Sequence, residues 1–178
     1  MRRLLPVGLL LAVVILAAGC SSDSSDPETA ADWADGVCTA FTTWADSIKA
    51  ASDPLTSGDI SKDSLRSAAD DLESATATLE SDLKGLGKPD IEAGQEAKDA
   101  VDQLSSDLKT GAESIKSTAA DVSSIGDIVA ATAKVGTTLA TLQGQVTSTF
   151  TTLEQLDAKG ELRDAFEQAS ACQQLSSS

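Results

Sequence analysis

Residues 97–122, AKDAVDQLSSDLKTGAESIKSTAADV, decide the fold class of this chain. Apolar residues recur in this stretch at spacings of three and four, and charged residues mostly avoid that line. The apolar positions are Ala97, Val101, Leu104, Leu108, Ala112, Ile115, Ala119 and Val122. Such a period places apolar side chains on one side of an α-helix. The pattern predicts a helix over residues 90–122, about 50 Å long at 1.5 Å per residue.

The segment before this stretch is also expected to be helical. Leucine recurs there every seven residues, at Leu65, Leu72, Leu79 and Leu86. This spacing is typical of a seam between packed helices. The helix is expected to begin at Ser61 or Lys62 and to end at Gly85, Gly87 and Pro89.

A first helix is expected over residues 30–52. Its inward positions are Trp33, Val37, Phe41, Trp44 and Ile48. Pro54 disfavours helical conformation at the residue before it, so the helix should end near Ser52. Both tryptophans are expected in the core rather than on a ligand, because large aromatic side chains dominate burial energetics.

Residues 127–157 carry the same apolar spacing but have an unusual surface. No charged residue lies between Val135 and Leu153, and seven threonines crowd that interval. Threonine favours strands, so a hairpin around Gly144 competes with a helix over residues 135–153. The four-residue step from Val146 to Phe150 favours the helix, since a strand alternates with a period of two. The uncharged side of such a helix either packs centrally or forms a contact surface for a partner.

A short last helix is expected over residues 161–174. The five segments together predict an all-α fold, an antiparallel up-down four-helix bundle with a short extra C-terminal helix. Residues 30–178 are long enough for one domain with one core. Alanines at many seam positions allow close helix approach and disfavour an internal cavity.

The first 20 residues have the layout of a secretory signal. Two arginines precede an apolar run over residues 4–16, which is shorter than the roughly 20 residues that span a bilayer. Ala17, Ala18 and Gly19 then lead into Cys20. This ending resembles the lipobox of bacterial lipoproteins. The resemblance implies that residues 1–19 are removed and that Cys20 carries a diacylglycerol, which anchors the protein to the extracytoplasmic face of the cell membrane.

Residues 20–29 are expected to form a flexible tether after the lipidated cysteine. Residues 21–28 contain serine, aspartate, proline and glutamate and no large apolar side chain to bury. The serines are also candidate glycosylation sites in an exported protein, a question that composition alone leaves open. The wider composition, rich in alanine, aspartate, threonine and serine, is similar to that of small lipoproteins from high-GC Gram-positive bacteria.

Two cysteines remain once Cys20 is assigned to lipid. An even number of cysteines in an exported domain predicts a disulfide between Cys38 and Cys172. In an up-down bundle the start of the first helix and the end of the chain lie at the same end, which brings these positions together.

Charge and composition exclude several classes of function. The net charge is −15, and removal of residues 1–19 takes away two arginines and no acid, which gives −17. Such a surface repels nucleic acid and anionic headgroups. The chain has no histidine or tyrosine and no phosphate-binding glycine motif, so we expect neither an enzyme nor a cofactor. The acids Asp70, Asp71 and Glu73 are expected to form a solvated face rather than a metal site.

These observations indicate a membrane-anchored, non-catalytic envelope lipoprotein that binds or scaffolds another envelope component through a helical face. The alternative is a carrier of a small apolar ligand or lipid inside the bundle, which requires an internal cavity of several hundred Å³. A third reading, an acidic cation-binding protein, predicts a change in stability on addition of calcium.

The assignment of Cys20 is testable by fractionation. We expect Cys20→Ala to move the protein from the membrane to the soluble or secreted fraction, because the acyl chains that hold it there are lost. An unchanged membrane fraction would contradict the assignment.

Overall fold

The structure, a computed structural model, describes residues 29–56 and 60–176. Within these two ranges the chain forms six helices: α1 (Ala30–Thr56), α2 (Lys62–Gly85), α3 (Gly94–Ala120), α4 (Ile125–Leu156), α5 (Glu161–Gln168) and α6 (Ser170–Ser176). The all-α prediction is confirmed for the described residues. The competing hairpin around Gly144 is wrong, because residues 125–156 form one helix.

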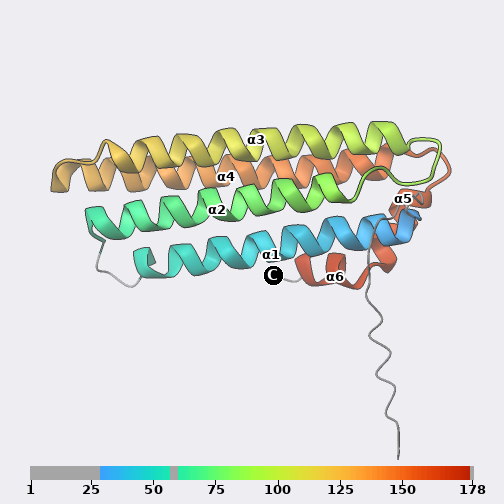
Figure 1. Cartoon of the computed structure of the whole chain (residues 1–178), viewed down its shortest axis with the longest axis horizontal. Helices are drawn as coiled ribbons and strands as arrows, with labels where there is room; N and C mark the ends of the chain where they lie inside the picture. The colour runs from blue at the N-terminus through green and yellow to red at the C-terminus, as the bar shows by residue number, and fades with distance from the viewer. Residues whose placement is uncertain (1–28, 57–59, 177–178) are drawn as a thin grey trace, which may run out of the picture.

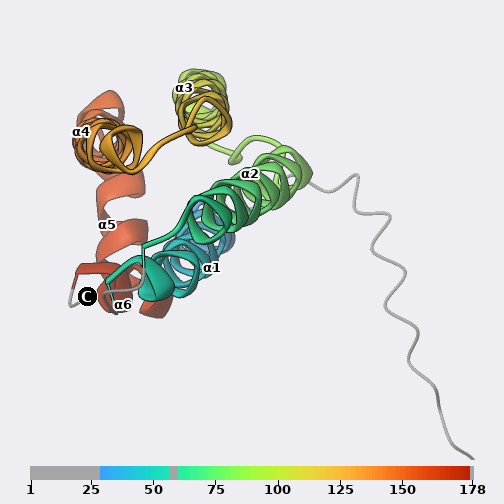
Figure 2. The ribbon, with the colours of Figure 1, turned by 90° about the vertical axis from the view of Figure 1, so that its left-hand side faces the viewer.

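The four long helices lie side by side, and each connection reverses the chain direction (Figure 1). α1 packs on α2, α2 on α3, and α3 on α4. α5 then crosses from the end of α4 towards α1, and α6 lies against α1 (Figures 1 and 2). Apart from its contact with α3, the backbone of α4 has its most extensive contact with α5, not with α1.

Helix starts follow from capping residues. Ser61 caps α2 in a reciprocal pair with Ser64, and Ser124 caps α4 in the same way with Asp127. Such pairs satisfy backbone N–H groups that have no partner within the helix. Hydrogen bonds from the hydroxyls of Ser123 and Ser124 and from their backbone N–H groups lower the pKa of Asp127 to about 2. The carboxylate of Asp127 therefore remains ionised as a cap in ordinary buffers.

Two predicted boundaries were wrong near proline residues. α1 continues past Ser52 to Thr56 with Pro54 in its last turn. This extension brings Leu55 against a buried cluster of α2 and α3, and that burial offsets the hydrogen bond that proline cannot make. α3 begins at Gly94 rather than residue 90, because residues 89–94 form two tight turns closed by backbone hydrogen bonds from Ile91 and Gly94.

The predicted last helix over residues 161–174 is two helices. Ala169 adopts an extended conformation and separates α5 from α6. The break redirects the chain, so that Ala171 and Cys172 pack against the core beside α1. The turn before α5 is held by Asp157, whose carboxylate accepts hydrogen bonds from the backbone N–H groups of Lys159 and Leu162. The bond from Lys159 is the largest contribution that lowers the pKa of Asp157.

The core contains a continuous chain of aromatic rings. Edge contacts join Trp33 to Phe166 at 6.1 Å between ring centroids, Phe166 to Phe150 at 5.5 Å, Phe150 to Phe41 at 5.5 Å, and Phe41 to Trp44 at 6.3 Å. These are all five aromatic residues of the protein. Each edge-to-face pair adds about 0.5–1.5 kcal/mol beyond the area that it buries. The rings connect α1, α4 and α5 at one end of the molecule.

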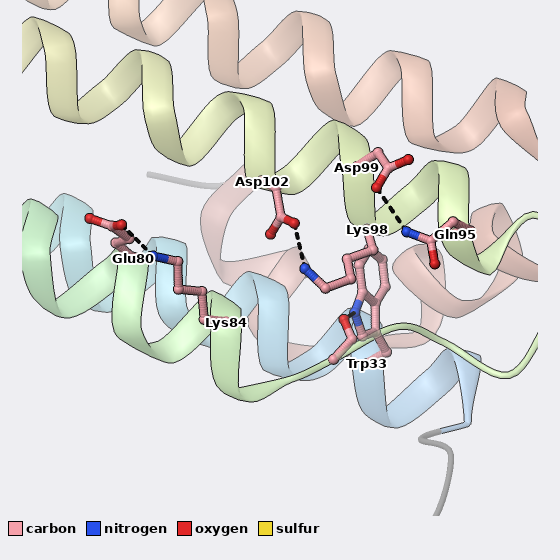
Figure 3. Close-up of polar contacts among 8 residues, drawn as sticks. Trp33, Glu80, Lys84, Gln95, Lys98, Asp99 and Asp102 are labelled. Atoms are coloured by element: carbon pink, nitrogen blue, oxygen red, sulfur yellow. Dashed lines mark hydrogen bonds and ion pairs between the residues drawn. The ribbon is translucent and has the colours of Figure 1, made fainter.

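Both tryptophans are buried and satisfied, as expected from the sequence. The indole N–H of Trp33 donates to the carbonyl of Gly87 in the α2–α3 connection (Figure 3). The indole N–H of Trp44 donates to the hydroxyl of Thr76 in α2. Both indole N–H groups are therefore engaged within the protein.

A pair of glycine substitutions tests the packing of α3 on α4. A Cβ at Gly111 would lie 2.6 Å from Leu142 Cδ2 and 3.1 Å from its Cγ, whereas a Cβ at Gly144 meets nothing within 4 Å. We expect Gly111→Ala to lower the free energy of unfolding by about 1 kcal/mol, because overpacking exceeds the gain in helix propensity. Gly144→Ala should raise it by about 0.5–1 kcal/mol. Urea unfolding measures both, and shifts of the same sign would contradict the described packing.

Candidate functional site

The outward side of α4 is a continuous uncharged surface, which we call the α4 stripe. Its residues are spaced by three or four, and each is exposed. They are Ile125, Val129, Ala133, Gly136, Ala140, Gly144, Thr147 and Thr151. The opposite side of the helix supplies Ala131, Leu142 and Leu153 to the core. α4 is thus built as a helix with one buried side and one neutral, exposed side.

Threonine is tolerated in α4 because its hydroxyls bond to the helix itself. Thr137, Thr141, Thr147 and Thr151 each donate to the carbonyl four residues earlier. The hydroxyl hydrogen is therefore used within the helix, and the surface offers chiefly methyl and methylene carbons to its surroundings.

The first end of the α4 stripe is strongly apolar. Ile125 is 83% exposed and Val129 is 70% exposed. They lie one turn apart in the first turns of α4, and α4 begins at the end of the molecule far from α5 (Figure 1). Two large aliphatic side chains on adjacent turns form a small apolar tip.

The surface formed by α2 and α3 differs sharply from that of α4. Lys84 pairs with Glu80 within α2, and Lys98 pairs with Asp102 within α3 (Figure 3). Lys109 also reaches Glu80 at 3.4 Å, joining the two helices. Hydrogen bonds from Lys84 and Lys109 lower the pKa of Glu80. Exposed pairs of this kind stabilise little but keep the surface solvated.

The acid cluster predicted on α2 takes part in ion pairing. Lys116 of α3 lies 3.3 Å from Asp70 and also pairs with Glu73. The hydrogen bond to Glu73 is the largest of the contacts that raise the pKa of Lys116. Among the described residues, no group of three potential ligands is placed to hold a metal ion.

The structure brings Cys38 and Cys172 together. Their sulfurs are 1.98 Å apart and their Cα atoms 5.0 Å apart, which is disulfide distance. The bond joins α1 to α6 across 134 residues of sequence. Cys38 is buried and Cys172 is partly exposed. Cys20, the predicted lipid attachment site, lies outside the described residues.

An open groove of about 550 Å³ lies between α4 and the C-terminal helices. Its floor includes the disulfide, Val146, Phe150 and Phe166. Sequence reasoning missed this groove. Each aromatic position was identifiable as inward, but the meeting of four separate helices at one place depends on how the helices are ordered around the core.

The interior of the four long helices is nearly filled. The void that Leu55, Leu65, Ile115 and Leu139 help to line measures about 40 Å³. That is room for about one water molecule. A ligand of lipid size needs several hundred Å³, and this void does not provide them.

Comparison of the chain with protein-family models, with curated proteins and with solved structures gives no match. In the described part of the chain, no helix combines the length and the apolar character required to cross a bilayer. The function is therefore inferred from the α4 stripe and the groove beside the disulfide.

Removal of the disulfide should destabilise the domain. We expect the double variant Cys38→Ala, Cys172→Ala to lower the free energy of unfolding by up to about 5 kcal/mol, because a loop of this length is freed in the unfolded chain. Urea unfolding with and without dithiothreitol measures the loss. Reductant should weaken the wild type by a similar amount and leave the variant unaffected. A wild type that is insensitive to reductant would contradict the bond.

Proposed function

We propose that this protein is a non-catalytic lipoprotein of the cell envelope, anchored through Cys20, which docks another envelope protein on the α4 stripe. The antiparallel up-down four-helix bundle predicted from the sequence is part of this proposal, with α4 as the helix that presents the docking surface. The observation that carries it is the run of exposed, uncharged residues on one helix of a chain with a net charge of −15.

Charge makes the α4 stripe suitable for a protein contact. Burying an ion costs free energy unless it is paired, and the stripe contains no ion to bury. The exposed positions of the other three long helices, in contrast, include acidic residues, such as Asp46 of α1, Asp82 of α2 and Glu113 of α3. A partner can therefore cover the stripe at a smaller desolvation cost than the faces of α2 and α3.

Glycine supports the same interpretation. Gly136, Ala140 and Gly144 are four residues apart, so a partner helix can approach the backbone of α4 closely. Glycine inside a helix costs about 1 kcal/mol relative to alanine. A Cβ at Gly136 or Gly144 meets nothing within 4 Å, so packing within this chain does not require either glycine. Close packing of a partner helix on α4 explains why glycine is present at both positions.

The anchor leaves the α4 stripe accessible. α1 begins at the end of the molecule where α5 lies, and α4, whose first turns hold Ile125 and Val129, begins at the opposite end (Figure 1). A lipid at Cys20 would therefore hold the α5 end near the membrane. The stripe would extend away from it, towards proteins of the envelope.

Photocrosslinking tests the proposal directly. A benzophenone amino acid at Ala140 should give one adduct of defined mass in living cells, while the same group at Ala77, an exposed position on α2, should give none. Gly144→Gln in the Ala140 probe strain should remove most of the adduct, because the side chain blocks close approach. Stability should not fall, since glutamine is the better helix former.

Three results would contradict the proposal: equal adducts at both positions, no adduct at either, or an adduct unaffected by Gly144→Gln. An adduct of twice the protein's own mass would identify a second copy as the partner and would replace the proposal of a different envelope protein.

A further inference from the structure

We propose that the groove beside the disulfide is a binding site for a small organic cation with an apolar body. This inference differs from the proposed function because it concerns a small ligand beside the C-terminal helices, although Thr147 and Thr151 belong both to the α4 stripe and to the lining of the groove. It depends on three observations: an apolar floor, an acidic rim and the absence of a basic residue from the lining.

The groove exists because the contact between α1 and α4 is made by side chains. The rings of Phe41 and Phe150 meet at 5.5 Å and close the core side of the gap. On the outer side, α5 and α6 flank the gap without filling it, which leaves about 550 Å³ open to solvent. That volume lies within the range of small-molecule sites.

The floor of the groove is apolar and aromatic. Phe150 is partly exposed there, and Phe166 and the disulfide continue the surface. The face of an aromatic ring carries negative charge density and attracts cations. The edge contacts between Phe150, Phe166 and Phe41 fix these rings in place, so that a ligand meets a largely preformed surface.

Two carboxylates stand at the rim. Glu154 of α4 and Glu167 of α5 are exposed and line the groove. Within the described residues, neither carboxylate takes part in an ion pair, and no lysine or arginine lines the groove. The glutamates Glu80 and Glu73 of the α2–α3 face, in contrast, are paired with lysines.

The chemistry of the groove selects among ligand classes. An anion is repelled by the rim and by the net charge of the protein. A neutral apolar molecule gains binding free energy only from its contact with the floor. A cation with an aromatic or branched apolar body contacts the floor and the carboxylates together, and therefore gains most.

Two probes of the same shape and opposite charge test the proposal. Tetraphenylphosphonium and tetraphenylborate are titrated into the full chain in detergent, with a titration of detergent alone subtracted. We expect one saturable site for the cation and affinity for the anion at least about tenfold lower. Proton NMR should show shifts at the rings of Phe150 and Phe166, with little change at Trp44, which lies at the other end of the aromatic chain.

Matched variants separate the groove from general attraction to an acidic protein. Glu154→Gln with Glu167→Gln should weaken binding of the cation about fivefold to thirtyfold. Asp46→Asn with Asp121→Asn changes the net charge equally at exposed positions outside the groove, and should change affinity less than about twofold. Near-ultraviolet circular dichroism verifies that both variants keep the native packing.

Equal weakening by the two double variants would overturn the proposal, as would equal affinity for the two probes or the absence of a saturable site. A lysine-rich peptide that saturates the groove while the small cation does not would also overturn it, and would assign the groove to a protein ligand.

Discussion

The contact between the rings of Phe41 and Phe150 links α1, the first long helix, to α4, the last one. α4 packs along α3, but its backbone makes no extensive contact with α1. The ring pair joins the two helices at 5.5 Å, and Phe166 of α5 extends it. A single aromatic cluster thus connects the first helix, the fourth helix and the C-terminal segment, and the disulfide fixes the end of that segment beside it.

Both candidate surfaces are consequences of this arrangement. Because α4 is held by α3 and by the aromatic cluster, its remaining side stays exposed, and the sequence there is uncharged and rich in small residues. The groove lies where the rings end and α5 and α6 begin. One surface suits a flat contact with a protein helix, and the other suits a small ligand with a positive charge.

The sequence predicted the helices well because their causes are local. The period of α3, the Ser61 cap of α2 and the step from Val146 to Phe150 in α4 all act within a few residues. The errors came from tertiary contacts that override local preference. Burial of Leu55 carries α1 past Pro54, and packing of α6 on α1 accompanies the break at Ala169.

The candidate site was predictable only in part. The uncharged interval of residues 135–153 was visible in the sequence. Its exposure was not, because exposure depends on which other helices pack against α4. Val129 lies outside the apolar period that Val135, Leu139 and Leu142 define, and this was the local sign of its exposure. The disulfide followed from the number of cysteines, whereas the groove depends on the meeting of four helices.

Hydrogen exchange along α4 measures most directly whether the aromatic cluster holds this helix in place. In its first half, over residues 125–141, Ala131 is buried and Ile128, Val135 and Leu139 pack partly buried against the smaller core cluster, whereas the second half contributes Leu142, Leu153 and Phe150 to the main core. The account predicts that amides of residues 142–156 are protected nearly as strongly as those of residues 33–44 in α1, and that residues 127–139 exchange much faster. Uniform protection along α4, or stronger protection of its first half, would contradict the central role of the aromatic cluster.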